Sequence, residues 1–147
     1  VGTLIGLLAL GAGFGYYRVG APEWQTMIFL TLGFAQVFQA LATRSNTESV
    51  FATGLRGNGT MAAMIALVTG LQLAAVYLPW LHGPFLRLVP PTGLDLAVSI
   101  ALGSVVLLAI EFEKLLRRHI DKEENGLFPA AVIALDGPAW ERVVSTA

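Results

Sequence analysis

Long apolar stretches alternate along the chain with short polar ones. Charge-free runs cover residues 1–17, 26–43, 60–81 and about 96–110. A helix needs about 20 predominantly apolar residues to cross the hydrocarbon core of a bilayer. The pattern therefore predicts four membrane-spanning helices.

Two of these runs are shorter than a spanning helix requires. At about 1.5 Å per residue, residues 1–17 reach about 25 Å against a core of about 30 Å, and we expect the missing turn upstream of Val1, in a longer chain. The run 96–110 is followed by EFEKLLRRH, in which Glu113 and Arg117 stand at i,i+4 and favour continued helix. The fourth helix should therefore extend into water.

The composition agrees with that of a membrane protein and excludes several classes of function. Hydrophobic residues make up 55% of the 147 residues and charged residues 13%, outside the usual range of a soluble domain. A net charge of −1 provides no basic surface for nucleic acid. The absence of cysteine excludes disulfides, thiolate metal sites and a cysteine nucleophile. We expect an all-α membrane protein whose partners include the lipid bilayer and no nucleic acid.

Lysine and arginine are distributed unevenly between the two ends of the predicted helices. One side carries most of them: Arg44, Arg56, Lys114, Arg117, Arg118 and Lys122. The other side carries Arg18 and Arg87, and it also holds the aromatic residues typical of a membrane interface: Tyr16, Tyr17, Trp24, Tyr77 and Trp80. An excess of positive charge marks the cytoplasmic side. We therefore predict a four-helix bundle with both ends cytoplasmic.

The connecting segments differ in character. APEWQ, after Gly20, predicts a tight external turn, and residues 45–59, rich in serine, asparagine and glycine, predict a cytoplasmic loop. Residues 82–93 contain three prolines and should form an external loop lying on the membrane surface. IDKEENG predicts a charged linker, and the apolar segment after it is too short to span and is interrupted by a proline. The chain then divides into a transmembrane domain, residues 1–120, and a short non-spanning C-terminal tail of undefined role, residues 121–147.

Two amides interrupt the second apolar run. Gln36 and Gln39 lie three positions apart, on one face of the predicted helix, where an unsatisfied amide in lipid is costly. Both must therefore face protein or water. They are either structural, forming hydrogen bonds to a neighbouring helix, or they coordinate a cation through the amide oxygen, a ligand type that suits hard ions such as Ca²⁺. The spacing alone leaves both interpretations open.

Other residues of chemical interest favour structural roles. Four glycines in the first run form two small-xxx-small pairs and predict close helix packing: Gly2, Gly6, Gly11 and Gly15. His82 and His119 should lie at opposite membrane faces and cannot share a metal site. Asp95, in the first turn of the fourth helix, is expected to cap it. Serine and threonine occur without a neighbouring base and orienting acid, so the sequence predicts no catalytic site.

Three segments together resemble the C-terminal four transmembrane helices of P-type cation-transporting ATPases, in particular the calcium-pump-like group of bacteria. They are GLLALGAGFGYY in the first span, AQVFQALATRS from the second span into its loop, and AIEFEKLLRRH at the end of the fourth. The resemblance covers about residues 1–118 and implies the seventh to tenth helices of a pump. It implies that Gln36 is a cation ligand, and it leaves Gln39 to helix packing through an interhelical hydrogen bond. It also implies that the rest of the pump's membrane helices are the partners.

The resemblance also limits what this chain does alone. The family's phosphorylated aspartate, nucleotide-binding domain and main ion-binding helices have no counterpart here, so we expect ATP, Mg²⁺ and the transported cation to be used by the parent pump and no cofactor by this chain. Ca²⁺ is the expected cargo, with Na⁺, H⁺ or Mn²⁺ as alternatives. The expected location is a bacterial plasma membrane. The alternative function is a stand-alone four-helix membrane protein with a structural or partner-binding role.

Overall fold

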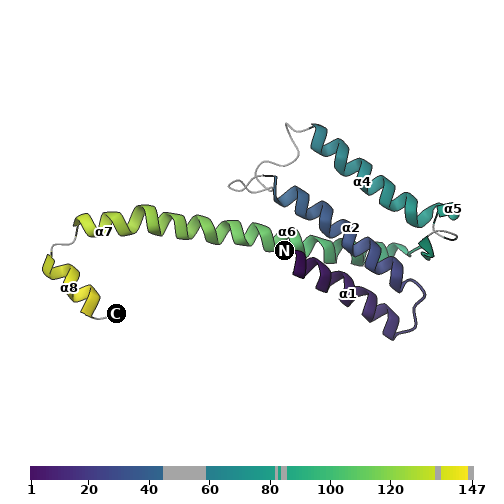
Figure 1. Ribbon diagram of the computed structural model, residues 1–147, viewed down its shortest axis with the longest axis horizontal. Helices are drawn as coiled ribbons and strands as arrows, with labels where there is room; N and C mark the ends of the chain where they lie inside the picture. Colours follow the sequence, from purple (N-terminus) through teal and green to yellow (C-terminus); the bar gives the residue numbers. More distant parts are fainter. Residues whose placement is uncertain (45–58, 82, 84–85, 135–136, 146–147) are drawn as a thin grey trace. The chain divides into compact units, whose positions relative to one another are not determined.

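A computed structural model describes residues 1–44, 59–81, 83, 86–134 and 137–145. All regular secondary structure within these ranges is helical, which confirms the predicted all-α class (Figure 1). The elements are α1 (Gly2–Arg18), α2 (Trp24–Ala42), α4 (Gly59–Tyr77), α5 (Pro79–Leu81), α6 (Gly93–Lys122), a π-helix η2 (Glu123–Leu127), α7 (Phe128–Ala134) and α8 (Gly137–Ser145). Residue contacts divide the chain into two units, Val1–Glu111 and Phe112–Ala147.

Three helical segments of the described chain are long and apolar enough to cross a membrane. They are Trp24–Ala42, Gly59–Tyr77 and Gly93–Ala131, which coincide with the second, third and fourth predicted spans. The first helix, α1, forms where it was predicted, but its 17 residues leave it short of a full crossing. A membrane crossing by α1 therefore stays a prediction.

The turn between α1 and α2 is closed by a glycine. Gly20 has a φ of 73°, and its N–H donates to the carbonyl of Tyr17 at 3.0 Å. The N–H of Ala21 donates to the carbonyl of Tyr16, also at 3.0 Å. This is a Schellman motif, in which glycine adopts the left-handed conformation that other residues disfavour. The tight turn predicted for this segment is confirmed.

Helix α2 is the central element of the first unit, with α1 on one side and α4 on the other (Figure 1). One apolar cluster joins α1, α2 and α6, and its buried members are Ile5, Ala35, Ala42, Val106, Leu107 and Ile110. A second joins α2, α4 and the segment before α6, with Leu30, Phe34, Val76 and Leu88 buried. Helix α6 approaches α2 closely, because a Cβ atom on Gly103 would lie 2.8 Å from the Cβ of Phe34.

The segment before α6 packs in part against the bundle. Residues 82–93 were predicted to form an external loop on the membrane surface, and among the described ones Leu88 and Pro91 are buried, whereas Leu86, Arg87 and Pro90 are exposed. A position on the membrane surface stays a prediction. The hydroxyl of Thr26, at the start of α2, donates to the carbonyl of Val89 at 2.7 Å and accepts from its N–H at 3.0 Å. These two bonds satisfy backbone groups that proline-rich chain cannot pair in a helix, so the segment packs into the end of the bundle. His82 and Pro84, like the predicted loop 45–58, lie outside the described residues.

The second unit begins within α6 and remains helical where a linker was predicted. The expected extension of the fourth helix is confirmed, with Arg117 donating to Glu113 at 2.7 Å. IDKEENG, predicted as a charged linker, is helical, because α6 continues to Lys122 and is followed by the π-helix Glu123–Leu127. Pro129, near the start of α7, cannot donate to a carbonyl one turn earlier, and the wider π turn before it is a known way to accommodate such a break. The proposed domain boundary at 120/121 stays a prediction.

Candidate ion-binding face of the second helix

The two predicted amides occupy different environments on α2. Gln36 is exposed, whereas Gln39 is partly buried. Gln36 lies 12 residues after the first residue of α2, about 18 Å along the helix axis, and therefore well inside the membrane-length segment. An exposed amide at such a depth is costly against lipid, so this position is the strongest candidate for contact with something beyond the described chain.

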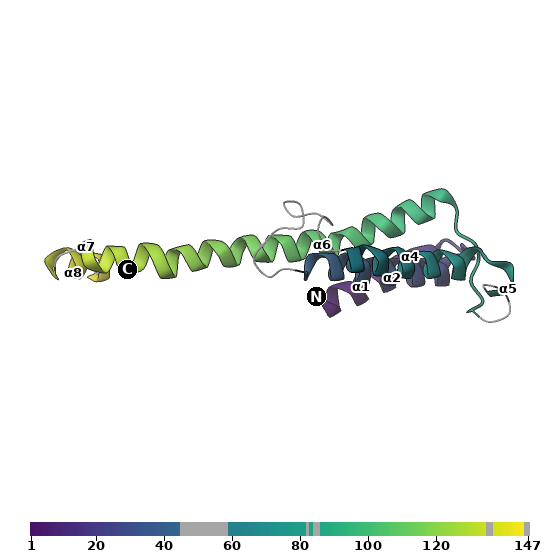
Figure 2. The same cartoon turned by 90° about the horizontal axis from the view of Figure 1, so that it is seen from above.

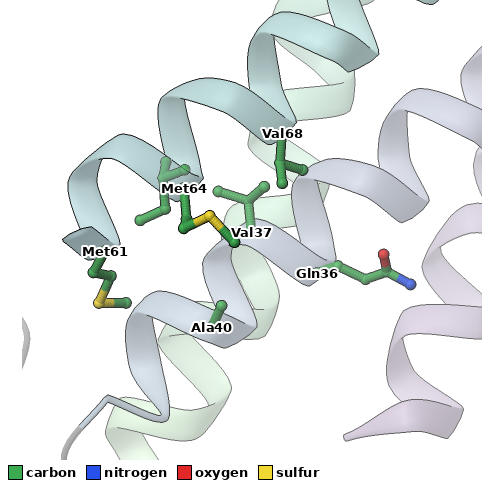
Figure 3. Close-up of a pocket in the computed structure, with 7 residues that line it drawn as sticks. Gln36, Val37, Ala40, Met61, Met64 and Val68 are labelled. Atoms are coloured by element: carbon green, nitrogen blue, oxygen red, sulfur yellow. The ribbon is translucent and has the colours of Figure 1, made fainter.

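A groove of about 280 Å³ separates part of α2 from α4. Gln36, Val37 and Ala40 contribute from α2, and the facing wall is apolar and comes from α4: Met61, Met64, Ile65 and Val68. Figure 3 shows the amide of Gln36 projecting away from the methionine side chains. The polar group therefore lies at the rim of the groove and is directed to the opposite side.

The described residues supply few further ligands for a cation. No group of three or more histidine, cysteine, aspartate or glutamate side chains gathers in this part of the chain. A hard cation such as Ca²⁺ takes six to eight oxygen ligands, as a general rule. Gln36 can therefore be one member of a coordination shell, and the shell needs oxygens from elsewhere.

A third amide, Gln72 of α4, makes an interhelical hydrogen bond, which was one of the two interpretations left open for the glutamines of α2. Its residue is 6% exposed, and its Nε2 donates to the carbonyl of Leu30 on α2 at 3.0 Å. Gln72 was not predicted as a contact residue, although it is a glutamine in the middle of an apolar run, as Gln36 is. The buried glutamine that forms a hydrogen bond between two helices therefore belongs to α4 and not to α2.

The predicted glycine pairs of α1 face open space. A Cβ atom on Gly2, Gly6, Gly11 or Gly15 would meet no described atom within 4 Å. The glycine of α1 that meets α2 is Gly13, where a Cβ atom would collide with the side chain of Ile28. Helix packing by the two predicted pairs therefore stays a prediction, and it requires a partner beyond the described residues.

A partly buried polar cluster lies where α1 ends and α6 begins. Asp95 accepts from the Tyr16 hydroxyl at 2.6 Å and from the N–H of Thr92 at 2.8 Å. The N–H of Asp95 donates in turn to the Thr92 hydroxyl at 3.3 Å. This reciprocal pair is a capping box, so the predicted capping role of Asp95 is confirmed. Its contact with Tyr16 was not predicted.

The fold and these polar positions define a helical membrane domain that presents one amide on an exposed face. The family model described as "Cation transporting ATPase, C-terminus" matches residues 1–116. Calcium-transporting ATPase 1 of Saccharomyces cerevisiae is 30% identical over 104 residues, which cover 70% of this chain and 11% of that protein. Calcium-transporting ATPase type 2C member 1 of Homo sapiens is 32% identical over 122 residues, which cover 79% of this chain and 13% of that protein. No solved structure matches at a significant level.

This chain belongs to the family of C-terminal membrane segments of cation-transporting ATPases. The resemblance predicted from the three sequence segments is therefore confirmed. The chain spans only 11% to 13% of the length of the two relatives named above. Those relatives come from yeast and human, so a bacterial source stays a prediction.

Proposed function

We propose that this chain forms the last membrane helices of a P-type ATPase that pumps Ca²⁺ across a membrane. Family membership and the calcium-transporting relatives support the class of pump and the cargo. Within the structure, the observation that carries the proposal is the exposed side chain of Gln36 in a helix long and apolar enough to span. A polar side chain at membrane depth is costly unless it faces protein, water or an ion.

In this proposal Gln36 supplies one neutral oxygen to the transported cation. The remaining oxygens come from membrane helices outside this chain, because the described residues offer no acidic cluster. ATP and Mg²⁺ are bound by other domains of the pump, which convert hydrolysis into movement of the ion-binding helices. The role of this chain is then to supply a ligand and to support the helices that carry the others.

The same proposal includes the membrane topology. Helix α1 also crosses the membrane, which gives four spans in all, both ends of the chain are cytoplasmic, and the glycines of α1 contact other helices of the pump. The orientation rests on the excess of lysine and arginine at one end of the spans, and the aromatic residues where α1 ends and α2 begins support a membrane interface at the other end. The rings of Tyr17 and Trp24 meet there edge to face, with centroids 5.7 Å apart. Such aromatic residues are typical of a membrane interface.

The experiment that tests the ligand role is cation-dependent phosphorylation by ATP in the intact pump, titrated with Ca²⁺. Gln36→Ala removes one oxygen from the site and should raise the half-saturating Ca²⁺ concentration without lowering expression. Gln39→Ala is the matched control, since Gln39 is partly buried on the same helix. Equal half-saturating concentrations in the two variants would contradict the ligand role.

A further inference from the structure

The contact between α2 and α4 is built around one amide and one glycine. A Cβ atom on Gly33 would lie 2.5 Å from the side-chain amide carbon of Gln72. The amide therefore occupies the space that any larger residue at position 33 would fill. Gln72 is 6% exposed and packs against the backbone of α2 at Gly33 and Leu30. This close approach sets the distance between the two helices.

The hydrogen bond also fixes the direction of the Gln72 amide. A carbonyl can only accept, so the group within 3.0 Å of the Leu30 carbonyl must be the Nε2 donor. The Oε1 atom then points the other way, and it is buried with no hydrogen-bond partner among the described residues. A buried amide whose oxygen has no hydrogen-bond partner is costly compared with an apolar side chain. This geometry favours a role for Gln72 in positioning α2 against α4, and not in stability alone.

The contact is close to the candidate ion ligand. Gly33 precedes Gln36 by three residues, about 4.5 Å along the axis of α2. Gln36 also lines the groove whose facing wall is α4. A rotation of α2 against α4 would therefore turn the Gln36 amide, and the Gln72 contact opposes that rotation because it combines a close packing with a directed bond.

We propose that Gln72 is a positioning residue, which holds α2 in the rotation that presents the Gln36 amide to the transported cation. The inference rests on the proposed function. According to this inference, cation affinity depends on a second residue, Gln72, which lies on another helix and does not contact the ion.

The test uses the intact pump and the Ca²⁺ titration of ATP-dependent phosphorylation. Gln72→Met keeps the length and approximate volume of the side chain and removes the donor. Gln72→Glu has nearly the same shape and can keep a donor, because burial in an apolar contact favours the neutral carboxyl. Leu71→Met is the matched control, because Leu71 is the preceding residue of α4 and is 62% exposed. Thermal midpoints are measured on the same samples.

Gln72→Met should raise the half-saturating Ca²⁺ concentration about threefold or more, the equivalent of an average hydrogen bond between membrane helices. Gln72→Glu and Leu71→Met should remain near the parent value. The double variant Gln36→Ala/Gln72→Met should be no weaker than Gln36→Ala alone, because a positioning residue acts through its target. Gly33→Ala displaces the amide by contact and should reproduce the shift of Gln72→Met, and it decides the question if Gln72→Met does not accumulate.

The outcomes separate this inference from the proposed function. If Gln36→Ala shifts the titration and neither Gln72→Met nor Gly33→Ala does, Gln72 has no positioning role and the ligand role of Gln36 stands. A lower thermal midpoint without a shift in half-saturation leads to the same conclusion. If Gln36→Ala itself has no effect, both proposals are overturned.

Discussion

The hydroxyl of Tyr16, near the end of α1, donates a 2.6 Å hydrogen bond to Asp95 in the first turn of α6, 79 residues later in the chain. Asp95 is 7% exposed and is also held by Thr92. The bond thus joins a helix end to a capping box. It connects the first and last helices of the first unit through polar atoms.

We expect Tyr16→Phe to lower the free energy of unfolding of the bundle by about 1–2 kcal/mol, because a hydrogen bond to a buried carboxylate is lost. Tyr17→Phe is the control, since Tyr17 is 62% exposed, and it should change little. Both are measured by unfolding the detergent-solubilised chain. If the two variants unfold alike, the Tyr16–Asp95 bond does not hold the helices together.

A second prediction concerns the closest approach of α6 to α2. A Cβ atom on Gly103 would lie 2.9 Å from the backbone nitrogen of Ala35, which cannot move aside as a flexible side chain does. Gly103→Ala should therefore destabilise the chain by about 1–3 kcal/mol through overpacking. Gly70→Ala, where nothing lies within 4 Å, should stabilise it by about 0.5–1 kcal/mol through helix propensity. Thermal unfolding of the two variants should move in opposite directions.

Local features of this fold could be predicted from the sequence, because their causes are local. The helix extension past Glu111 follows from charges at i,i+4 spacing, and the Glu113–Arg117 pair forms as expected. The turn at Gly20 follows from the need for a left-handed residue at a helix end. The helical conformation of the charged segment 120–126 was not predicted, because its composition suggested only a linker, whereas α6 and the π turn after it continue the helix to Pro129.

Features that depend on how helices meet could not be predicted. Thr26 contacts a segment 63 residues away and Gln72 contacts a carbonyl 42 residues away, and no spacing rule links such positions. For Gln36 the sequence predicted only that its side chain faces either protein or water, and did not decide between them. The glycine of α1 that packs on α2 is Gly13, which belongs to neither predicted pair, because the rotation of a helix is set by its neighbours.

The open glycine face of α1 gives a third prediction. Gly6→Leu should be tolerated by the isolated chain, since nothing described lies within 4 Å of the added Cβ atom. In the intact pump the same change should reduce stability and activity, because close packing by small residues with another helix would be blocked. Gly13→Leu should damage both. If Gly6→Leu is equally harmless in the pump, the face contacts lipid and the packing prediction is wrong.

A fourth prediction concerns topology. A single cysteine at Lys122 should react with a membrane-impermeant reagent only from the cytoplasmic side, and one at Gly83 only from the opposite side. The reason is the excess of lysine and arginine near one end of the spans. Labelling in intact and permeabilised cells provides the measurement. Reaction of the Lys122 cysteine in intact cells would reverse the proposed orientation.

The fifth prediction compares two buried threonines of α2, both 0% exposed. Thr26 exchanges two hydrogen bonds with the backbone of Val89, whereas the hydroxyl of Thr31 has no hydrogen-bond partner among the described residues. Thr→Val preserves shape and removes the hydroxyl in each case. The same substitution at two positions of one helix therefore compares how much a hydrogen-bonded hydroxyl and an unpaired hydroxyl each contribute to the free energy of unfolding.

Thr26→Val should cost about 2–4 kcal/mol, because it leaves the N–H and the carbonyl of Val89 without their buried partner. Thr31→Val should be neutral or stabilising, since an unpaired buried hydroxyl carries a desolvation cost and valine does not. The free energies of unfolding are measured in one detergent. If Thr26→Val is no worse than Thr31→Val, water replaces the threonine at Val89, and the segment before α6 is not held to the bundle by these two bonds.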